Sequence, residues 1–217
     1  MPSFIFQEVF MPYKTIYAEA KDSFIEQKSE FIGYIAPVKT EEEAVAFINK
    51  VEAENRKARH NCYAYVLKEG NISRFSDNGE PQGTAGPPIL DVIVKNGLSD
   101  VCIVVTRYFG GILLGKGGLT RAYSTGASMA VSAAKIASFS EAYSFKLRLD
   151  YSFYDKLCRV LTAFGAVTIN TDFAEEVEIS LVIKKDSLES LKKQVADLGS
   201  GSILLSELTE LLYDFGE

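Results

Sequence analysis

The chain of 217 residues contains one histidine, three cysteines and no tryptophan. One histidine and the scattered Cys62, Cys102 and Cys158 do not form a metal-ligand set with the spacing of zinc sites, so we expect no metal and no cofactor. An odd cysteine count without paired spacing indicates reduced core thiols. No apolar run approaches the roughly 20 residues that span a membrane, and the first ten residues lack a signal-peptide pattern. The sequence therefore predicts a cytoplasmic protein that does not bind membranes.

Charge, proline and glycine divide the chain near the same point. All six prolines and 12 of the 16 glycines precede residue 140. Residues 1–140 carry 15 basic and 15 acidic side chains, whereas residues 141–217 carry 8 and 14, which accounts for the net charge of −6. An acidic protein gains nothing from non-specific attraction to phosphate backbones. We expect two domains, 1–137 and 138–217, with any nucleic-acid contact made by a local basic surface on the first.

The second part has the clearer periodicity. Apolar residues alternate with polar ones in three segments. In two further segments they recur at helical spacing, and each of these two helical segments ends at a glycine. The expected elements are strand 145–151, helix 157–164, strand 167–169, strand 177–183, helix 188–198 and strand 202–208. The order β-α-β-β-α-β predicts a ferredoxin-like plait.

The first part has the pattern of an α+β domain. Thr40 and Glu43 form a capping box at the start of an amphipathic helix. The other expected elements are strands 15–20, 23–27, 31–38 and 62–67, a long loop to residue 88, helix 89–95, strand 101–106 and a helix from about residue 119. The predicted fold class is α+β with two domains.

Five glycines lie within residues 110–118, between a buried strand and a helix. Gly110, Gly115 and Lys116 match a P-loop, but Gly117 occupies the place of the hydroxyl that binds Mg²⁺, so a nucleotide hydrolase is not expected. Arg107, Lys116 and Arg121 around backbone N–H groups could form an anion site. The alternative is a tight crossover with exposed basic residues.

Segment 75–88 is a second dense patch of polar residues, glycines and prolines. It is longer than most connections in compact domains, which are typically ~4–6 residues. It could present Asp77, Asn78, Glu80 and Thr84 to a partner, with free N–H groups at Gly83–Gly86 opening the next helix. The alternative is an elaborate turn.

The single histidine, His60, lies between Arg59 and Asn61 at the start of a strand. Such a histidine is more often structural than catalytic, and Asn61 could contact a ligand or cap a turn. Cys62 shares a strand face with His60 but has no third group that would complete a catalytic set. Without a nucleophile elbow or a recognisable dyad, the sequence supports a binding protein better than an enzyme.

Three blocks of this sequence resemble the YigZ/IMPACT family. They are Arg59–Ala64, Phe75–Gly86, and Arg107–Gly115 with the following Gly117-Gly118-Leu119; Lys28–Ile32 resembles the family's N-terminal motif, with Glu30 where a basic residue is frequent. The match covers about residues 13–135. Because residues before Met11 extend beyond the usual family start, either Met1 or Met11 could be the natural initiator.

The resemblance implies a first domain like the second domain of small-subunit ribosomal protein five, a fold also found in domain four of elongation factor G. It implies a ferredoxin-like tail domain of the kind found in bacterial members and in the same elongation factor. Eukaryotic members regulate translation by interfering with a kinase that senses uncharged tRNA, whereas bacterial members have no settled activity, and a fold does not decide a function.

Three hypotheses follow. The first is a translation-linked regulator that contacts RNA or the ribosome through its motif loops. The second is an enzyme or sensor that binds a small phosphorylated ligand at the glycine-rich loop, and the third is a protein-interaction module. The candidate binding residues are Arg59, His60, Asn61, Asp77, Asn78, Glu80, Thr84, Arg107, Tyr108, Gly110, Gly111, Lys116 and Arg121.

Overall fold

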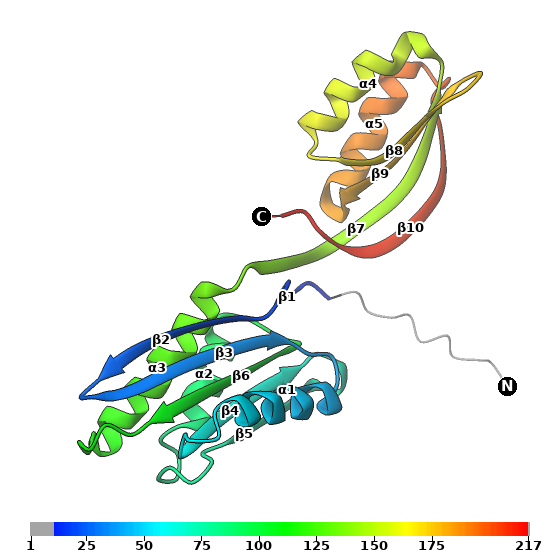
Figure 1. The fold of residues 1–217 in the computed structure, drawn as a ribbon. Helices are drawn as coiled ribbons and strands as arrows, with labels where there is room; N and C mark the ends of the chain where they lie inside the picture. The colour runs from blue at the N-terminus through cyan, green and yellow to red at the C-terminus, as the bar shows by residue number, and fades with distance from the viewer. Residues whose placement is uncertain (1–10, 217) are drawn as a thin grey trace, which may run out of the picture. The chain divides into compact units, whose positions relative to one another are not determined.

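A computed structural model describes residues 11–216. Met1 and the segment before Met11 lie outside the described residues. The chain forms two compact units, an N-terminal unit of Tyr13–Ala137 and a C-terminal unit that begins at Ser138 (Figure 1). Among the described residues, no helix combines the length and the apolar character needed to cross a bilayer.

The N-terminal unit is built on a five-stranded antiparallel sheet in the order β2-β3-β6-β4-β5. A short strand β1 (Tyr13–Ile16) precedes it. The sheet strands are β2 (Ala20–Glu26), β3 (Ser29–Pro37), β4 (His60–Leu67), β5 (Ile72–Ser76) and β6 (Val101–Tyr108). β6 lies at the centre and is buried from Val101 to Arg107, as its run of apolar residues predicts.

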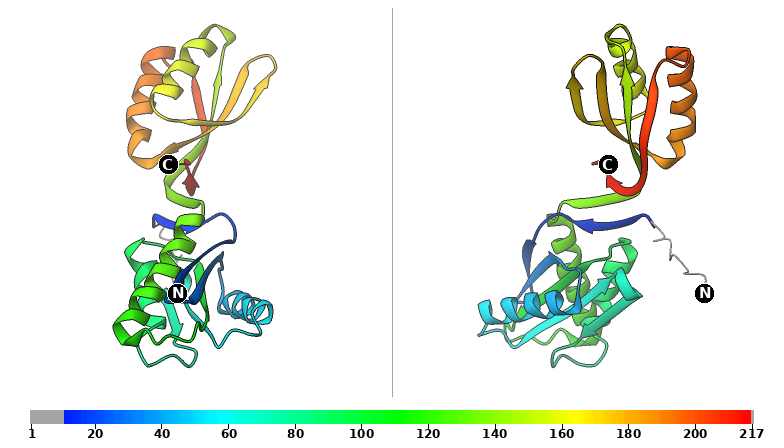
Figure 2. Two further views of the ribbon diagram at one scale, coloured as in Figure 1. Left: turned by 60° about the vertical axis from the view of Figure 1, so that its left-hand side comes forward. Right: turned by 90° about the vertical axis from the view of Figure 1, so that its right-hand side faces the viewer.

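Helices cover both faces of this sheet (Figure 2). Helix α1 (Glu41–Glu54) packs Phe47, Ile48 and Val51 on one face. Helices α2 (Gly86–Lys95) and α3 (Gly115–Ala133) pack on the opposite face, where the larger core forms. The hydroxyl of Thr40 caps α1, but the Glu43 carboxylate accepts the N–H of Lys39 rather than that of Thr40.

Helix α3 and strand β3 meet at two glycines. A Cβ atom on Gly33 would lie 2.0 Å from the carbonyl oxygen of Gly126, and a Cβ on Gly126 would lie 2.9 Å from a methyl carbon of Val105. Both side chains must be absent for α3 to approach the sheet this closely. The helix is thus held against the strand by backbone contact.

Three expectations for this unit were wrong in detail. The strand predicted over 15–20 is instead the end of β1, a bend over residues 17–19 and the first residue of β2. The segment predicted as one loop to residue 88 contains the turn Glu69–Asn71 and strand β5. The sequence of β5 shows no clear apolar alternation, since the polar Ser73 and Arg74 are followed by the apolar Phe75. All three side chains are exposed, so β5 contributes little to the core. Helices α2 and α3 begin three and four residues earlier than predicted, at glycines that the sequence pattern assigned to loops.

The C-terminal unit has the expected ferredoxin-like plait. β7 (Ile136–Leu149) leads into it, followed by α4 (Tyr151–Ala163), β8 (Val167–Phe173), β9 (Val177–Lys184), α5 (Leu188–Gly199) and β10 (Leu204–Asp214). The antiparallel strand order is β8-β9-β7-β10, and the core gathers apolar residues of α4, α5 and the sheet. Tyr151, predicted as the end of a strand, instead begins α4 behind the cap of Asp150.

Candidate functional site

The three motif blocks converge on one end of the N-terminal sheet. In the strand register Arg107 lies opposite His60 on β4 and opposite Phe31 on β3. The turn between β2 and β3 and the start of α3 lie at this same end (Figure 1). We call this region the motif end and define it by residues 27–31, 59–62, 75–86 and 107–121.

Asp77 closes the loop that leads into α2. Its Oδ1 accepts the N–H groups of Ala85 and Gly86, both at 2.9 Å, and its Oδ2 accepts that of Gly83 at 2.8 Å. Burial raises the pKa of this carboxyl, but the three backbone donors more than offset it and leave the pKa below its usual value. Of the N–H groups predicted to be free for a ligand, those of Gly83, Ala85 and Gly86 are therefore bound by Asp77, and that of Thr84 donates to the carbonyl of Pro81.

The start of β4 is joined to the same loop. The carbonyl oxygen of Asn78 lies 2.8 Å from Nδ1 of His60, which places a proton on Nδ1 because a carbonyl only accepts. The side chain of Asn78 accepts the N–H of Asn61, and the Cys62 thiol donates to the carbonyl of Asp77. Burial is the main cause that raises the pKa of Cys62 to about 12. A neutral, buried thiol of this kind is a poor nucleophile.

Arg107 and Glu80 form a buried ion pair beneath this loop. Nη1 of Arg107 lies 2.8 Å from Oε1 of Glu80, and the hydroxyl of Tyr123 donates to the same oxygen at 2.8 Å. Only 5% of Arg107 and 9% of Glu80 is exposed. The expectation that Arg107 adds to an exposed basic face is therefore wrong, since its charge is neutralised inside the unit.

Aromatic rings and a hydroxyl surround the rest of the Arg107 guanidinium. It lies 5.5 Å from the ring centre of Phe31 and 5.3 Å from that of Phe109, distances typical of cation–π contacts. Its Nη2 approaches the Ser29 hydroxyl at 3.5 Å, and that hydroxyl also accepts the N–H of Gly110. Arg107 thus links the β2–β3 turn, the loop after β5 and the glycine-rich loop.

Two glycines shape the loop between β6 and α3. A Cβ on Gly110 would lie 2.0 Å from the carbonyl carbon and oxygen of Lys28, so the two backbones touch. Gly111 has a φ of +86°, in the left-handed region that favours glycine. The glycine-rich loop is therefore held in one shape against the β2–β3 turn.

The surface of the motif end carries cations and an apolar loop. Arg59, Lys116 and Arg121 are exposed, and none of them has an ion-pair partner within residues 11–216. Between β6 and α3, Leu113 is 85% exposed, Phe109 43% and Ile112 39%. This segment, 109–114, has no charged side chain.

The remaining predicted residues act within the fold. The Thr84 hydroxyl donates to the carbonyl of Pro81, and the Tyr108 hydroxyl donates to Asn55. The Asn61 side chain accepts the buried hydroxyl of Thr106. With Asp77 and Glu80 also engaged, the polar groups that the phosphorylated-ligand hypothesis requires are already hydrogen-bonded inside the protein.

The sequence did not point to three residues that bind the predicted site residues: Tyr123, which contacts Glu80, Ser29, which contacts Arg107, and Thr106, which contacts Asn61. Tyr123 lies in a helix whose amphipathic pattern marks it as an ordinary core residue, and Thr106 ends an apolar strand. Only the fold brings them to Glu80 and Asn61. Ser29 offered one signal, because it lies in the motif segment Lys28–Ile32.

Comparisons with known proteins match both units. Residues 27–131 match the Impact N-terminal domain, and residues 147–202 match a domain of unknown function, DUF1949. The chain is 35% identical over 202 residues to the IMPACT family member YvyE of Bacillus subtilis, covering 92% of this chain and 93% of that protein. The chain belongs to the IMPACT family. It is also 33% identical to the IMPACT family member YigZ of Escherichia coli, over 85% of this chain and 92% of that protein.

Eukaryotic IMPACT proteins resemble only part of this chain. The IMPACT homologue of Dictyostelium discoideum is 39% identical over 98 residues, which cover 43% of this chain and 28% of that protein. A crystal structure described as that of a hypothetical protein is 31% identical and aligns with a TM-score of 0.57 over 89% of this chain and 96% of the other. The resemblance found in the sequence is confirmed, as is the two-domain α+β fold.

Proposed function

We propose that this IMPACT-family protein is translation-linked and contacts RNA, in the setting of the ribosome, through the motif end. The observation that carries the proposal is the group of exposed cations, Arg59, Lys116 and Arg121, none of which is paired within the described residues. Arg59 directly precedes His60, and all three cations lie on the part of the chain whose charges balance, while the acidic excess lies in the other part.

Phosphate contacts supply most of the affinity of proteins that bind nucleic acids without reading sequence. Three unpaired cations around an uncharged loop suit such contact, because no carboxylate within 109–114 would repel the backbone. The charge of Glu80 is compensated by Arg107, whereas Asp77 keeps its charge and turns it toward three backbone N–H groups.

The test is co-sedimentation of the full-length protein with purified ribosomes over a range of salt concentrations. Binding should weaken as salt rises. The triple variant R59A/K116A/R121A should bind at least tenfold more weakly at low salt and show a shallower dependence of log K on log salt. Each lost phosphate contact should reduce that slope by about 0.7–0.9.

A charge-matched control uses three exposed cations of the C-terminal unit. K156A/R159A/K193A removes the same number of positive charges, and none of these side chains is ion-paired in the part of the chain described. The control should bind like the wild type. Equal loss in both triple variants would show an effect of net charge alone, and no binding at low salt would remove the proposal.

A further inference from the structure

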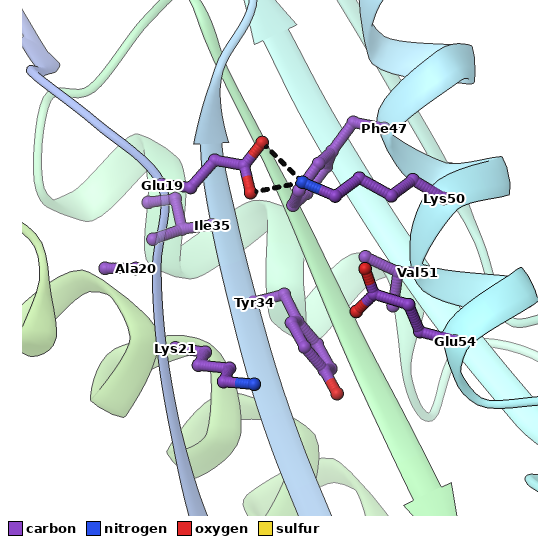
Figure 3. A pocket seen from close by; sticks show the side chains of 9 residues that line it. All are labelled: Glu19, Ala20, Lys21, Tyr34, Ile35, Phe47, Lys50, Val51 and Glu54. Carbon is purple, nitrogen blue, oxygen red and sulfur yellow. Dashed lines mark hydrogen bonds and ion pairs between the residues drawn. The ribbon is translucent and has the colours of Figure 1, made fainter.

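A pocket of about 360 Å³ lies on the other side of the N-terminal sheet from α2 and α3. It opens between helix α1 and the strands β2 and β3 (Figure 3). Its small apolar floor comes from Tyr34 on β3 and Phe47 on α1, which are 9% and 7% exposed, with Val51, 1% exposed, packed behind them. Phe47, Val51 and Glu54 are spaced at i, i+4 and i+7, so α1 presents all three along one side.

Charged side chains of both signs surround this apolar surface. Nζ of Lys50 lies 2.7 Å from a carboxylate oxygen of Glu19, so this ion pair bridges α1 and the start of β2 at one end of the pocket. Lys21 on β2 and Glu54 on α1 point toward the Tyr34 ring from opposite sides (Figure 3). Neither has an ion-pair partner among residues 11–216.

The position of Lys21 is fixed by the strand pairing. Lys21 lies directly opposite Tyr34 in the β2–β3 register, and its Nζ is 5.8 Å from the ring centre. The Tyr34 hydroxyl is held by the buried side chain of Asn55, with donor–acceptor distances of 3.1 and 3.3 Å. The aromatic floor is therefore fixed in orientation, while an unpaired cation and an unpaired anion lie on either side of it.

We propose that this pocket binds a small zwitterion with an apolar side chain, namely a free α-amino acid. The ligand's carboxylate would contact Lys21, its ammonium would contact Glu54, and its side chain would lie on the exposed edges of Tyr34 and Phe47. The volume is at the small end of the range for ligand sites, about 300–1,000 Å³. A nucleic acid does not fit this pattern, because half of the charged groups around the pocket are carboxylates.

The test uses the full-length protein and L-phenylalanine and L-leucine as probes, followed by ¹H–¹⁵N NMR. Saturable shifts should appear for amides of 19–21, 34–35 and 47–54. N-acetyl-L-phenylalanine lacks the ammonium and L-phenylalanine amide lacks the carboxylate, so each should bind about fivefold more weakly than phenylalanine, as expected for one exposed charge pair of about 1 kcal/mol.

Two variants assign the two contacts. The Glu54→Gln variant should bind N-acetyl-L-phenylalanine, which lacks the ammonium, as tightly as it binds phenylalanine. It should still bind L-phenylalanine amide, which lacks the carboxylate, more weakly. In Lys21→Met the pattern should reverse. Lys39→Met and Glu26→Gln, exposed residues outside the pocket, should leave both sensitivities unchanged.

Several outcomes would overturn the site. These are shifts that do not saturate, shifts spread over the whole unit, or ligand-charge sensitivities that persist in both pocket variants. The ribosome-binding triple variant R59A/K116A/R121A should bind amino acids like the wild type, because none of its residues lines the pocket. The two proposals can therefore fail separately.

Discussion

The Arg107 guanidinium and the Tyr123 hydroxyl share one carboxylate oxygen of Glu80, each at 2.8 Å. Removing one member of a buried ion pair commonly costs about 3–5 kcal/mol, because the other charge is left without compensation. Arg107→Met should therefore lower the free energy of opening of the N-terminal unit by about 3 kcal/mol. Hydrogen exchange of the β6 amides, followed by mass spectrometry, measures this quantity for the unit itself.

The double variant R107M/E80Q provides the control. It buries no charge, and the amide oxygen introduced by Glu80→Gln keeps an acceptor for Tyr123, so at least half of the lost stability should return. A double variant that loses the sum of both single losses would show that the pair is not coupled.

Asp77→Asn tests the carboxylate that accepts the N–H groups of Ala85 and Gly86 and so caps the start of α2 from outside the helix. The substitution keeps one acceptor but places an amide donor against a backbone N–H, and loss of a helix cap costs about 0.5–2 kcal/mol. Because the folded-state pKa of Asp77 is lowered, its carboxylate stabilises the fold above the unfolded value near 3.8, and this contribution is lost as the pH falls through the folded value.

The difference in thermal midpoint between wild type and Asp77→Asn should thus be largest near pH 6 and shrink below about pH 4. Differential scanning calorimetry from pH 6 to pH 3 gives the comparison. A difference that is constant with pH would contradict the role of the ionised carboxylate.

Gly110→Ala tests the contact between the glycine-rich loop and the β2–β3 turn. The added Cβ would overlap the Lys28 backbone at 2.0 Å, and backbone cannot rotate away as a side chain can. We expect a loss of stability above about 1 kcal/mol and NMR shifts at 27–29 as well as at 109–111. Chemical shifts confined to residue 110 and its neighbours would contradict this arrangement.

Gly117→Ala is the matched control in the same segment. The nearest atom to its added Cβ is an Arg121 nitrogen at 3.7 Å, an ordinary contact, and the position lies inside α3. Because alanine has a higher helix propensity than glycine, the free energy of unfolding of this variant should rise by up to about 1 kcal/mol. A loss similar to that of Gly110→Ala would show that any glycine substitution here is harmful.

Tyr65→Phe tests the alkaline limit of stability. Burial and the 2.6 Å hydrogen bond to Glu41 raise the pKa of Tyr65 to about 12. A raised folded-state pKa stabilises the protein below the unfolded value near 10 and loses that contribution as the pH rises toward 12. Tyr65→Phe should therefore be less stable than wild type at pH 8 and lose less stability between pH 9 and pH 11, measured by circular dichroism in urea.

Much of the fold was predictable because its signals are local. The helix cap at Thr40, the glycine stop at Gly165 and the alternation of Phe145, Leu147 and Leu149 each lie within one turn or strand. The predicted plait of the C-terminal unit is confirmed for this reason.

The candidate site was predictable in place but not in its internal contacts. The clustering of polar residues with glycines marked three loops that meet at one sheet end. Nothing local shows that Arg107 is neutralised by a residue 27 positions earlier, or that Asp77 binds amides up to nine positions later. The first contact depends on the order of strands β4, β5 and β6, and the second on the path of the loop between β5 and α2, and only the tertiary structure provides either.

The backbone contact between Gly33 and Gly126 also limits how α3 can move. No side chain stands between the two elements that could change its rotamer and let the helix slide. The contact therefore fixes how closely α3 lies on β3 at this point of the helix. Lys116 lies about 15 Å from Gly126 along the helix axis, at 1.5 Å per residue. A tilt of α3 by a few degrees about its contact with Gly33 would therefore move the backbone at Lys116 by about 1 Å.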